Sequence, residues 1–321
     1  MFSIRTDLAM EAREMLKENA EKKEEIDGIE VETTEKDHIT VTKVMVKNQL
    51  GQEALGKPVG TYVTIESPQI KYSIDEYEET CRLLAEEIRQ MAHITEDSTV
   101  LVVGLGNDAV TPDALGPKVV SQLMVTRHIK EHMPQYVEEG IRSVCAVAPG
   151  VLGTTGIETV EIVEGVVECV KPDCVIAVDA LASRSIDRIS TTIQVADTGI
   201  SPGAGIGNNR KGLNEETLGV KVIAIGVPTV VDAATIACDS IDIALRDMEA
   251  QGNGQSYEAL KTMDDKYQLI AKALSENIGT LMVTPKDVDL LIDKVSKTVA
   301  NGINMALHKD LTFDDIESYV G

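Results

Sequence analysis

The chain has 321 residues, of which 43% are hydrophobic, and it carries a formal charge of −23 at pH 7. At roughly 150 residues per domain, this length allows one large domain or two smaller ones. So negative a charge argues against nucleic acid and anionic membrane surfaces as direct partners, because binding phosphate groups requires a basic face. We therefore expect partners that are basic or weakly charged.

Nothing in the sequence indicates membrane insertion, secretion or a disulfide framework. No apolar run reaches the ~18 residues of a membrane span, and the N-terminal MFSIRTDLAM lacks the apolar core of a signal peptide. The five cysteines are scattered, odd in number and never in a C-x-x-C pair. This usage is typical of reduced thiols in a cytoplasmic protein, which is the location we expect.

Residues 1–72 predict a helix followed by a small β-rich element. Asp7 can cap an amphipathic helix that covers residues 8–19. Two segments dominated by β-branched residues, 38–46 and 61–65, predict strands on either side of a turn region rich in Gly and Pro. We expect this element to pack on the main body of the protein.

The segment from Thr99 to Val120 is the centre of the predicted fold. A capping box at Ser73–Glu76 starts a helix that leads into it. Its apolar run, residues 100–103, suits a strand that is covered on both faces. Thr111 and Pro112 then predict a helix start, with Thr111 as the cap and Pro112 at the first helical position.

Strands and helices alternate along the rest of the chain. A helix is expected from Asp113 to about Met133, and its His128 and His132, one turn apart, are either a metal pair or an ordinary helix surface. The β-α-β order favours an α/β fold with a doubly wound, mainly parallel sheet and helices on both faces. Further strands are predicted at 143–147, 174–178, 189–195 and 220–225, and a further helix at 160–170.

The C-terminal part of the chain contains one irregular segment and one long helix. Residues 248–270 are polar and interrupted, and we expect a mobile insertion there. Residues 284–287 predict the start of a helix whose apolar face continues to Leu307. Since no internal repeat is present, we expect residues 1–321 to form a single domain.

Two aspartates follow apolar strands at their carboxyl ends, Asp113 and Asp179. All such ends of a parallel sheet point one way, so the two side chains can line one crevice, where open α/β sheets bind ligands. Two carboxylates within a few Å cannot both ionise easily, so the pair can share a proton. The ionised member would activate a water, and the protonated member would polarise a scissile carbonyl. The alternative for Asp113 is structural, because an acidic residue in a first helical turn complements the helix dipole.

The loop from Asp197 to Gly212 is the second candidate for chemistry. Glycines, among them Gly203 and Gly205, leave it little regular structure, and Arg210 and Lys211 form a cationic pair in a very acidic chain. Long irregular loops in compact domains are often binding loops. We expect these four residues to bind substrate, and the alternative is a flexible surface loop.

Several long strings of the sequence resemble the germination protease family of spore-forming bacteria. They are VLVVGLGNDAVTPDALGP, IAVDALASRS, SPGAGIGNNRKGLNEETLG with the following VIAIGVPTVVDA, and MVTPKDVDLLIDKVS. The resemblance begins at SIRTDLA near the N-terminus and extends to the last long helix, so it covers nearly the whole chain.

This resemblance implies an endopeptidase that starts the degradation of small acid-soluble spore proteins during germination, in the cytoplasm of the spore core and without a cofactor. It implies an unorthodox aspartic peptidase whose two aspartates correspond to Asp113 and Asp179. It also implies a fold similar to that of the hydrogenase-maturation peptidases, and a homotetramer made as a zymogen. The family's propeptide is cleaved just ahead of the segment that matches Phe2–Arg5, which here follows the initiator Met almost at once. We therefore expect either a mature form or a shortened propeptide.

Two other functions are compatible with the sequence. The hydrogenase-maturation peptidases use carboxylates and a histidine around a metal, which suggests a metal-assisted peptidase, although His128 and His132 have no evident link to either aspartate. The net charge also fits a catalytically silent acidic protein that binds basic peptides.

Overall fold

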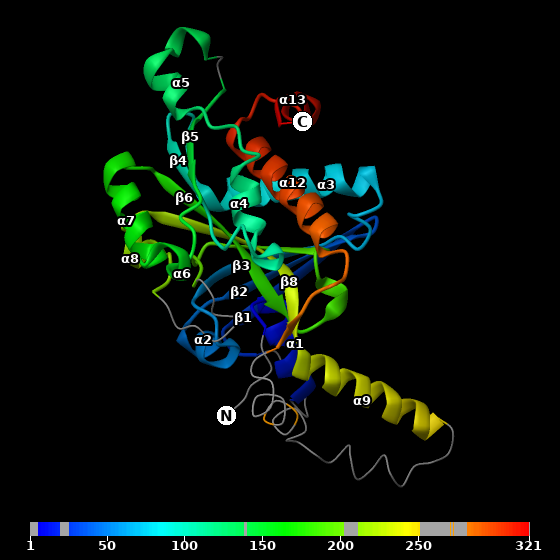
Figure 1. Ribbon diagram of the computed structural model, residues 1–321. Coiled ribbons are helices and arrows are strands. Elements are labelled where there is room, and N and C mark those ends of the chain that lie inside the picture. Colours follow the sequence, from blue (N-terminus) through cyan, green and yellow to red (C-terminus); the bar gives the residue numbers. More distant parts are fainter. Residues whose placement is uncertain are drawn as a thin grey trace.

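The computed structural model contains one sheet that runs through the whole protein (Figure 1). It describes residues 6–19, 26–137, 140–201, 211–250, 270, 272 and 281–320. Within these residues the sheet has nine strands in the order β1-β2-β3-β7-β8-β6-β4-β5, and β9 pairs with β8. None of the helices in this part of the chain is both long and apolar enough to cross a membrane.

The strands are β1 (Ile29–Lys36), β2 (Ile39–Val46), β3 (Gly60–Glu66), β4 (Thr99–Gly104), β5 (Ser143–Val147), β6 (Cys174–Ser183), β7 (Thr192–Ala196), β8 (Lys221–Asp232) and β9 (Met282–Val283). The helices are α1 (Ala9–Asn19), α2 (Gln49–Leu55), α3 (Ile74–Ala92), α4 (Leu115–Val120), α5 (Arg127–His132), α6 (Leu152–Thr155), α7 (Thr159–Val170), α8 (Glu215–Leu218), α9 (Ala233–Ala250), α12 (Val288–Leu307) and α13 (Phe313–Val320). Short 3₁₀ turns are η1 (Thr111–Asp113), η2 (Pro134–Tyr136) and η3 (Ile186–Arg188).

The parallel half of the sheet confirms the predicted β-α-β alternation. β8, β6, β4 and β5 are neighbours, and all three of these pairings are parallel. The apolar runs at the centre of β4 and β6 are almost fully buried, as expected for strands covered on both faces.

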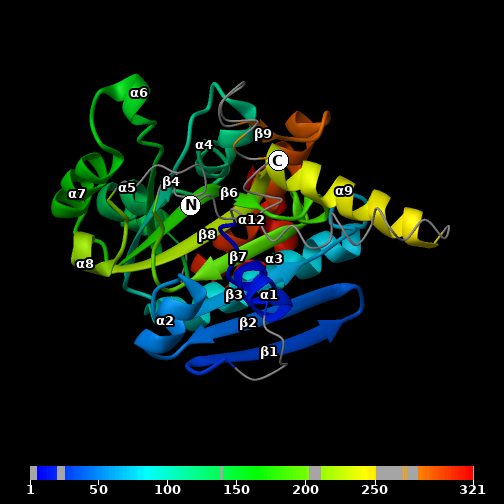
Figure 2. The same ribbon diagram turned by 90° about the horizontal axis from the view of Figure 1, so that it is seen from below.

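The other half of the sheet is antiparallel, and it contains the strands predicted at 38–46 and 61–65, which continue the main sheet and do not form a separate element packed on it. β7 pairs antiparallel with both β8 and β3, and β2 and β1 continue the sheet to its outer edge (Figure 2). The mostly exposed strand β1 was missed, because its sequence IEVETTEK carries charged residues and little of the apolar alternation that marks a strand.

Helices cover both faces of the sheet, as predicted. Alternate residues of β4 and β6 point to opposite faces, so that Val102 and Ile176 pack with α3 and α12, whereas Val103 and Val175 pack with α7 and α8. α3 begins where the capping box predicts, since Ser73 accepts a hydrogen bond from the backbone N–H of Glu76 at the helix N-terminus.

The single helix predicted from Asp113 to Met133 is wrong. The chain forms η1, α4 and α5 instead, and Val110 rather than Thr111 takes the cap position of η1, without a side-chain cap bond. The break is held from outside the segment, because the backbone N–H of Met124 donates to Asn304 Oδ1 on α12. A local periodicity cannot report such a long-range bond.

β6 and β8 both extend beyond their predicted ends, because each remains paired with the other. The sequence predicts that β6 ends before Asp179 and that β8 ends before Gly226, whereas the ladder between them continues from Asp179↔Gly226 to Ser183↔Val231. Asp179 therefore lies within a strand, and not after it. Asp232 ends β8 and accepts a hydrogen bond from the Ala234 N–H.

The C-terminal end of α12 buries an imidazole next to a guanidinium. His308 is fully buried, and its Nε2 lies 3.3 Å from the carbonyl oxygen of Met124. Arg142 Nη1 donates to the carbonyl oxygen of Leu307 at 2.8 Å. Burial lowers the pKa of His308 to about 4, against the hydrogen bond with Met124 and with help from the charges of Arg142 and Lys130.

Replacing this histidine should change how stability depends on pH. In the unfolded chain the imidazole binds a proton below about pH 6.5, but in the folded chain only below about 4. Folding stability due to this group is therefore lost as pH falls through that window. Between pH 7 and pH 4.5, wild type should lose folding stability on the order of 3 kcal/mol through this group, and His308→Gln should not show that loss. Urea unfolding at the two pH values measures the difference.

The control is His128→Gln, because His128 is exposed on α5. It should keep the pH dependence of the wild type. A stability difference between wild type and His308→Gln that stays constant with pH would contradict this account.

Candidate active site

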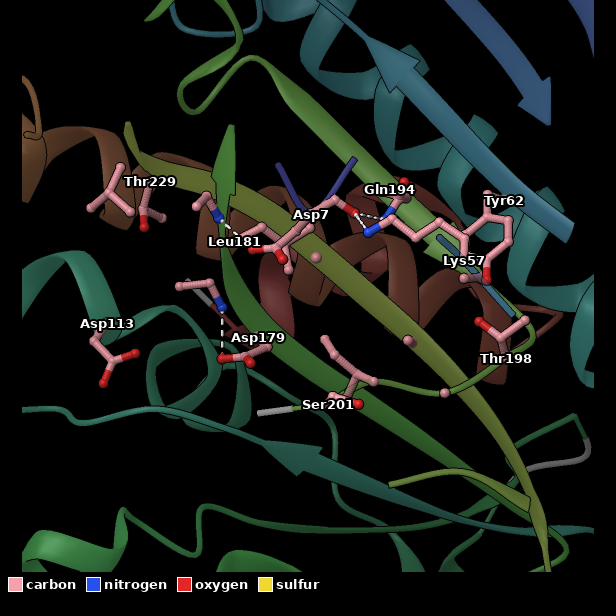
Figure 3. A pocket seen from close by; sticks show the side chains of 18 of the residues that line it. Asp7, Lys57, Tyr62, Asp113, Asp179, Leu181, Gln194, Thr198, Ser201 and Thr229 are labelled. Atoms are coloured by element: carbon pink, nitrogen blue, oxygen red, sulfur yellow. Dashed lines mark hydrogen bonds between the residues drawn. The ribbon is translucent and has the colours of Figure 1, made fainter. Parts of the chain in front are cut away.

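A cavity of about 560 Å³ opens where β6 and β8 run past the end of β4. Its lining includes Asp113, Asp179, Asp7, Lys57 and Thr229, which come from five different segments of the chain (Figure 3). This is the carboxyl end of the parallel strands, where α/β sheets bind ligands.

Asp113 is held by the turn that follows β4. The backbone N–H of Asn107 lies 2.9 Å from Oδ2 of Asp113 and 3.0 Å from its carbonyl oxygen. Gly106 precedes this N–H with a φ of 110°, a conformation that favours glycine. Its α-carbon also packs so closely that a Cβ there would stand 2.0 Å from the Asp113 carbonyl oxygen.

Asp179 is a buried carboxyl group within β6, with 6% of its surface exposed. Its Oδ1 accepts a hydrogen bond from the Ala180 backbone N–H at 2.9 Å. Burial raises the pKa of Asp179 well above its ordinary value, and the charges of Asp113 and Asp7 raise it further, whereas the Ala180 bond lowers it. The protonated form of this carboxyl is therefore favoured at a pH where an exposed aspartate is ionised.

The structure thus brings the two aspartates selected from the sequence to one cavity. They are 66 residues apart in sequence and are brought together because β4 and β6 are neighbours in the sheet. Their catalytic roles stay a prediction at this point.

The Gly-rich loop contributes its base to the cavity. Gly199, Ile200 and Ser201 line it, and Ile200 and Leu213 exchange two backbone hydrogen bonds of 2.9 and 2.7 Å that close the loop. Lys211 is exposed and does not belong to the lining. The other predicted substrate-binding residues, Gly203, Gly205 and Arg210, lie outside the described residues, as does most of the insertion predicted at 248–270.

Sequence patterns missed Asp7 and Lys57 as residues of the cavity. Asp7 does not cap α1, since its Oδ2 accepts from the Ala182 N–H at 2.8 Å, while Gln194 Oε1 accepts from the Ala9 N–H at 2.8 Å at the start of the helix. Lys57 Nζ donates to the Asp7 carbonyl oxygen at 2.9 Å. Asp7 and Lys57 are bonded to residues far away in the sequence, so no local pattern could have identified either as a cavity residue.

Burial shifts the pKa values of Asp7 and Lys57 so that the neutral form of each is favoured. It raises the pKa of Asp7, against the charge of Lys57 and the bond with Ala182. It lowers the pKa of Lys57, against the negative charges of Asp7 and Glu11. The cavity therefore holds three carboxyl groups and one amine whose proton affinities depend on one another.

The histidine pair considered from the sequence lies elsewhere. His128 and His132 are both exposed on α5 and do not line the cavity. Among the residues that the structure describes, no group of three or more His, Cys, Asp or Glu side chains is arranged to hold a metal ion.

Comparison with known proteins gives the family. The sequence profile of the germination protease family matches residues 9–261 and 255–320. The chain belongs to the germination protease family. It is 50% identical to the germination protease of Clostridium tetani, over 99% of this chain and 100% of the relative. It is 49% identical to that of Clostridium perfringens strain 13, over 100% of both chains. For the Bacillus cereus AH187 enzyme, identity is 43% over 99% of this chain and 97% of the relative.

A side chain at Gly106 should displace the Asp113 turn of this germination protease family member. The Cβ of Gly106→Ala would meet the Asp113 carbonyl oxygen, and the positive φ adds strain of roughly 1–3 kcal/mol. We expect lower stability in urea unfolding and lower peptidase activity. Gly165→Ala in α7, where a Cβ meets nothing within 4 Å, is the control and should be stabilising by about 0.5–1 kcal/mol. Unchanged activity and stability in Gly106→Ala would contradict the close packing described here.

Removing the charge of Asp179 should stabilise the fold at neutral pH. A carboxyl whose folded pKa lies above its unfolded value contributes stability at low pH that is lost as pH rises through the folded pKa. Asp179→Asn should therefore unfold at a higher urea concentration than wild type at pH 7, and the gain should vanish as pH falls toward 3.8, the ordinary value. Asp27→Asn, at an exposed turn, serves as the control. A less stable Asp179→Asn at pH 7 would show that the ionised group is stabilised in the fold.

Proposed function

We propose that this protein is an endopeptidase that initiates the degradation of small acid-soluble spore proteins during germination, by an atypical aspartic mechanism. Membership of the germination protease family supports a peptidase that acts in germinating spores. The aspartic mechanism is supported by one observation above all: two carboxyl groups share a cavity, and the buried one has a raised pKa through burial and through the charge of the other.

In this mechanism the two aspartates have different roles because their surroundings differ. Asp179 is the acid, since its buried carboxyl keeps its proton, and Asp113 is the base. A water oxygen bonds to the scissile carbonyl carbon and gives its proton to Asp113, while Asp179 gives its proton to the carbonyl oxygen. When the intermediate collapses, the C–N bond breaks, Asp113 protonates the leaving amine, and the hydroxyl proton returns to Asp179.

The remaining parts of the proposal concern substrate and setting. We assign substrate binding to the loop that carries Gly203, Gly205, Arg210 and Lys211, because its base lines the cavity. We also propose that the enzyme works in the spore core as a homotetramer, that it is made as a zymogen, and that it uses no cofactor. A single domain, with a sheet like that of the hydrogenase-maturation peptidases, stays a prediction.

The two alternatives are less favoured by the geometry. A metal-assisted peptidase would need a ligand set near the aspartates, and His128 and His132 lie on a different part of the surface. A silent protein that binds basic peptides is less favoured, because a raised pKa weakens the negative charge of Asp179 and with it the attraction for a basic peptide.

The test compares cleavage of a purified small acid-soluble spore protein by wild type and two variants. Asp113→Asn and Asp179→Asn should each lower kcat by at least about 10³-fold, because each removes a proton-transfer group of the reaction. Wild-type activity should fall as pH rises through the raised pKa of Asp179, and it should survive exhaustive chelation.

Asp27→Asn is the matched control and should keep full activity, since Asp27 is exposed and does not line the cavity. Full activity in either site variant would remove that aspartate from the mechanism. Loss of wild-type activity on chelation, restored by a divalent metal, would favour the metal-assisted alternative.

A further inference from the structure

A β-bulge interrupts the ladder between β6 and β8, past Asp179 and between Leu181 and Ala182. The parallel register of β6 and β8 is regular up to Leu181↔Pro228, and resumes one residue later on β8 at Ala182↔Val230. Thr229 is the extra residue of β8, opposite the Leu181–Ala182 step of β6. Bulges next to active sites re-aim a side chain that a regular strand would point elsewhere.

The residue next to Thr229 fits a bulge. Pro228 has no backbone N–H, and proline within a sheet is found at edges, strand starts and bulges. Two further bonds fix the backbone on either side, since the Ser190 N–H donates to the Pro228 carbonyl oxygen at 2.8 Å and Thr284 Oγ1 donates to the Thr229 carbonyl oxygen at 2.9 Å. The ladder with β6, the Ser190 bond and the Thr284 bond therefore fix the backbone position of Thr229.

The side chain of Thr229 belongs to the cavity of the aspartates. Its surface is only 1% exposed, yet it lines the same cavity as Asp113 and Asp179. In Figure 3 its hydroxyl oxygen points toward the side of the cavity on which Asp113 and Asp179 lie. A buried hydroxyl that is aimed at a reaction space is available to the reacting atoms when water is excluded.

We propose that the Thr229 hydroxyl is a third catalytic group of the peptidase. It donates a hydrogen bond to the scissile carbonyl oxygen as negative charge develops there, before the proton of Asp179 is fully transferred. It gives up no proton of its own, so the balance of the reaction between water, Asp113 and Asp179 is unchanged. This inference rests on the proposed function, and it adds Thr229 to the catalytic residues Asp113 and Asp179.

This role complements the two carboxyl groups. Each aspartate must be in one protonation state to act, whereas a threonine hydroxyl is a donor across the whole working pH range. Removing one preorganised donor of this kind typically costs about 10²–10³-fold in kcat. The alternative interpretation is that Thr229 only fills space in a strand, where β-branched residues are favoured.

Valine separates the two interpretations, because it keeps the branched shape of threonine and lacks the hydroxyl. We expect Thr229→Val to lower kcat for the purified spore protein by about 10²-fold with KM within about twofold of wild type. Thr229→Ser should recover kcat to within about tenfold of wild type. The pH at which activity falls should stay that of wild type, since the hydroxyl does not titrate, whereas a collapsed site would shift it.

The control is Thr42→Val, a buried threonine of β2 outside the cavity, which should leave kcat unchanged. If Thr229→Val does not fold, judged by circular dichroism, Thr229→Ala is the second hydroxyl-free variant. A hydroxyl-free variant with wild-type kcat, or a serine variant as slow as valine, overturns the inference and leaves the proposed function standing. A wild-type chain that does not cut the substrate overturns the proposed function first, and this inference with it.

Discussion

The burial of the Asp179 carboxyl group is the constraint on which the site depends. An ionised carboxylate in the interior of a sheet is costly. Among the described residues, Asp179 accepts a hydrogen bond from the Ala180 N–H, while two further carboxyl groups line the same cavity. Binding a proton removes the charge of Asp179 and with it this desolvation cost. β6 can carry such a group because its neighbours β4 and β8 supply a rigid ladder up to the edge of the cavity. Fold and chemistry are thus linked through one side chain.

The far end of β6 is anchored by a second buried carboxylate, Glu11 of α1. It is 1% exposed and accepts hydrogen bonds from the backbone N–H groups of Arg184 and Ser185, at 2.7 and 3.1 Å. Arg188 lies between Glu11 and Glu66 of β3, with a distance of 3.0 Å to each. Unlike Asp179, this carboxylate is surrounded by donors. The N-terminal helix is therefore part of the frame that fixes the wall of the cavity.

The sequence predicted the parts of the fold that depend on nearest neighbours along the chain. The helix start at Ser73 and the buried runs of β4 and β6 were found because their signals are local. The helix expected to run to Met133 failed for the opposite reason, since a long-range bond from Met124 to Asn304 holds the non-helical segment between α4 and α5. The ends of β6 and β8 were placed too early, because glycine, proline and aspartate are turn signals that a neighbouring strand can override.

For the site, the sequence by itself selected Asp113 and Asp179, because an apolar run followed by an acidic residue is visible without any partner. Only the tertiary structure decided that Asp113 and Asp179 line the same cavity and that Asp7, Lys57 and Thr229 join them. These three side chains come from an N-terminal segment, a loop after α2 and a bulge in β8. Their meeting depends on strand pairing and helix docking between residues far apart in the chain, and burial, which sets the proton affinity of Asp179, exists only once those contacts have formed.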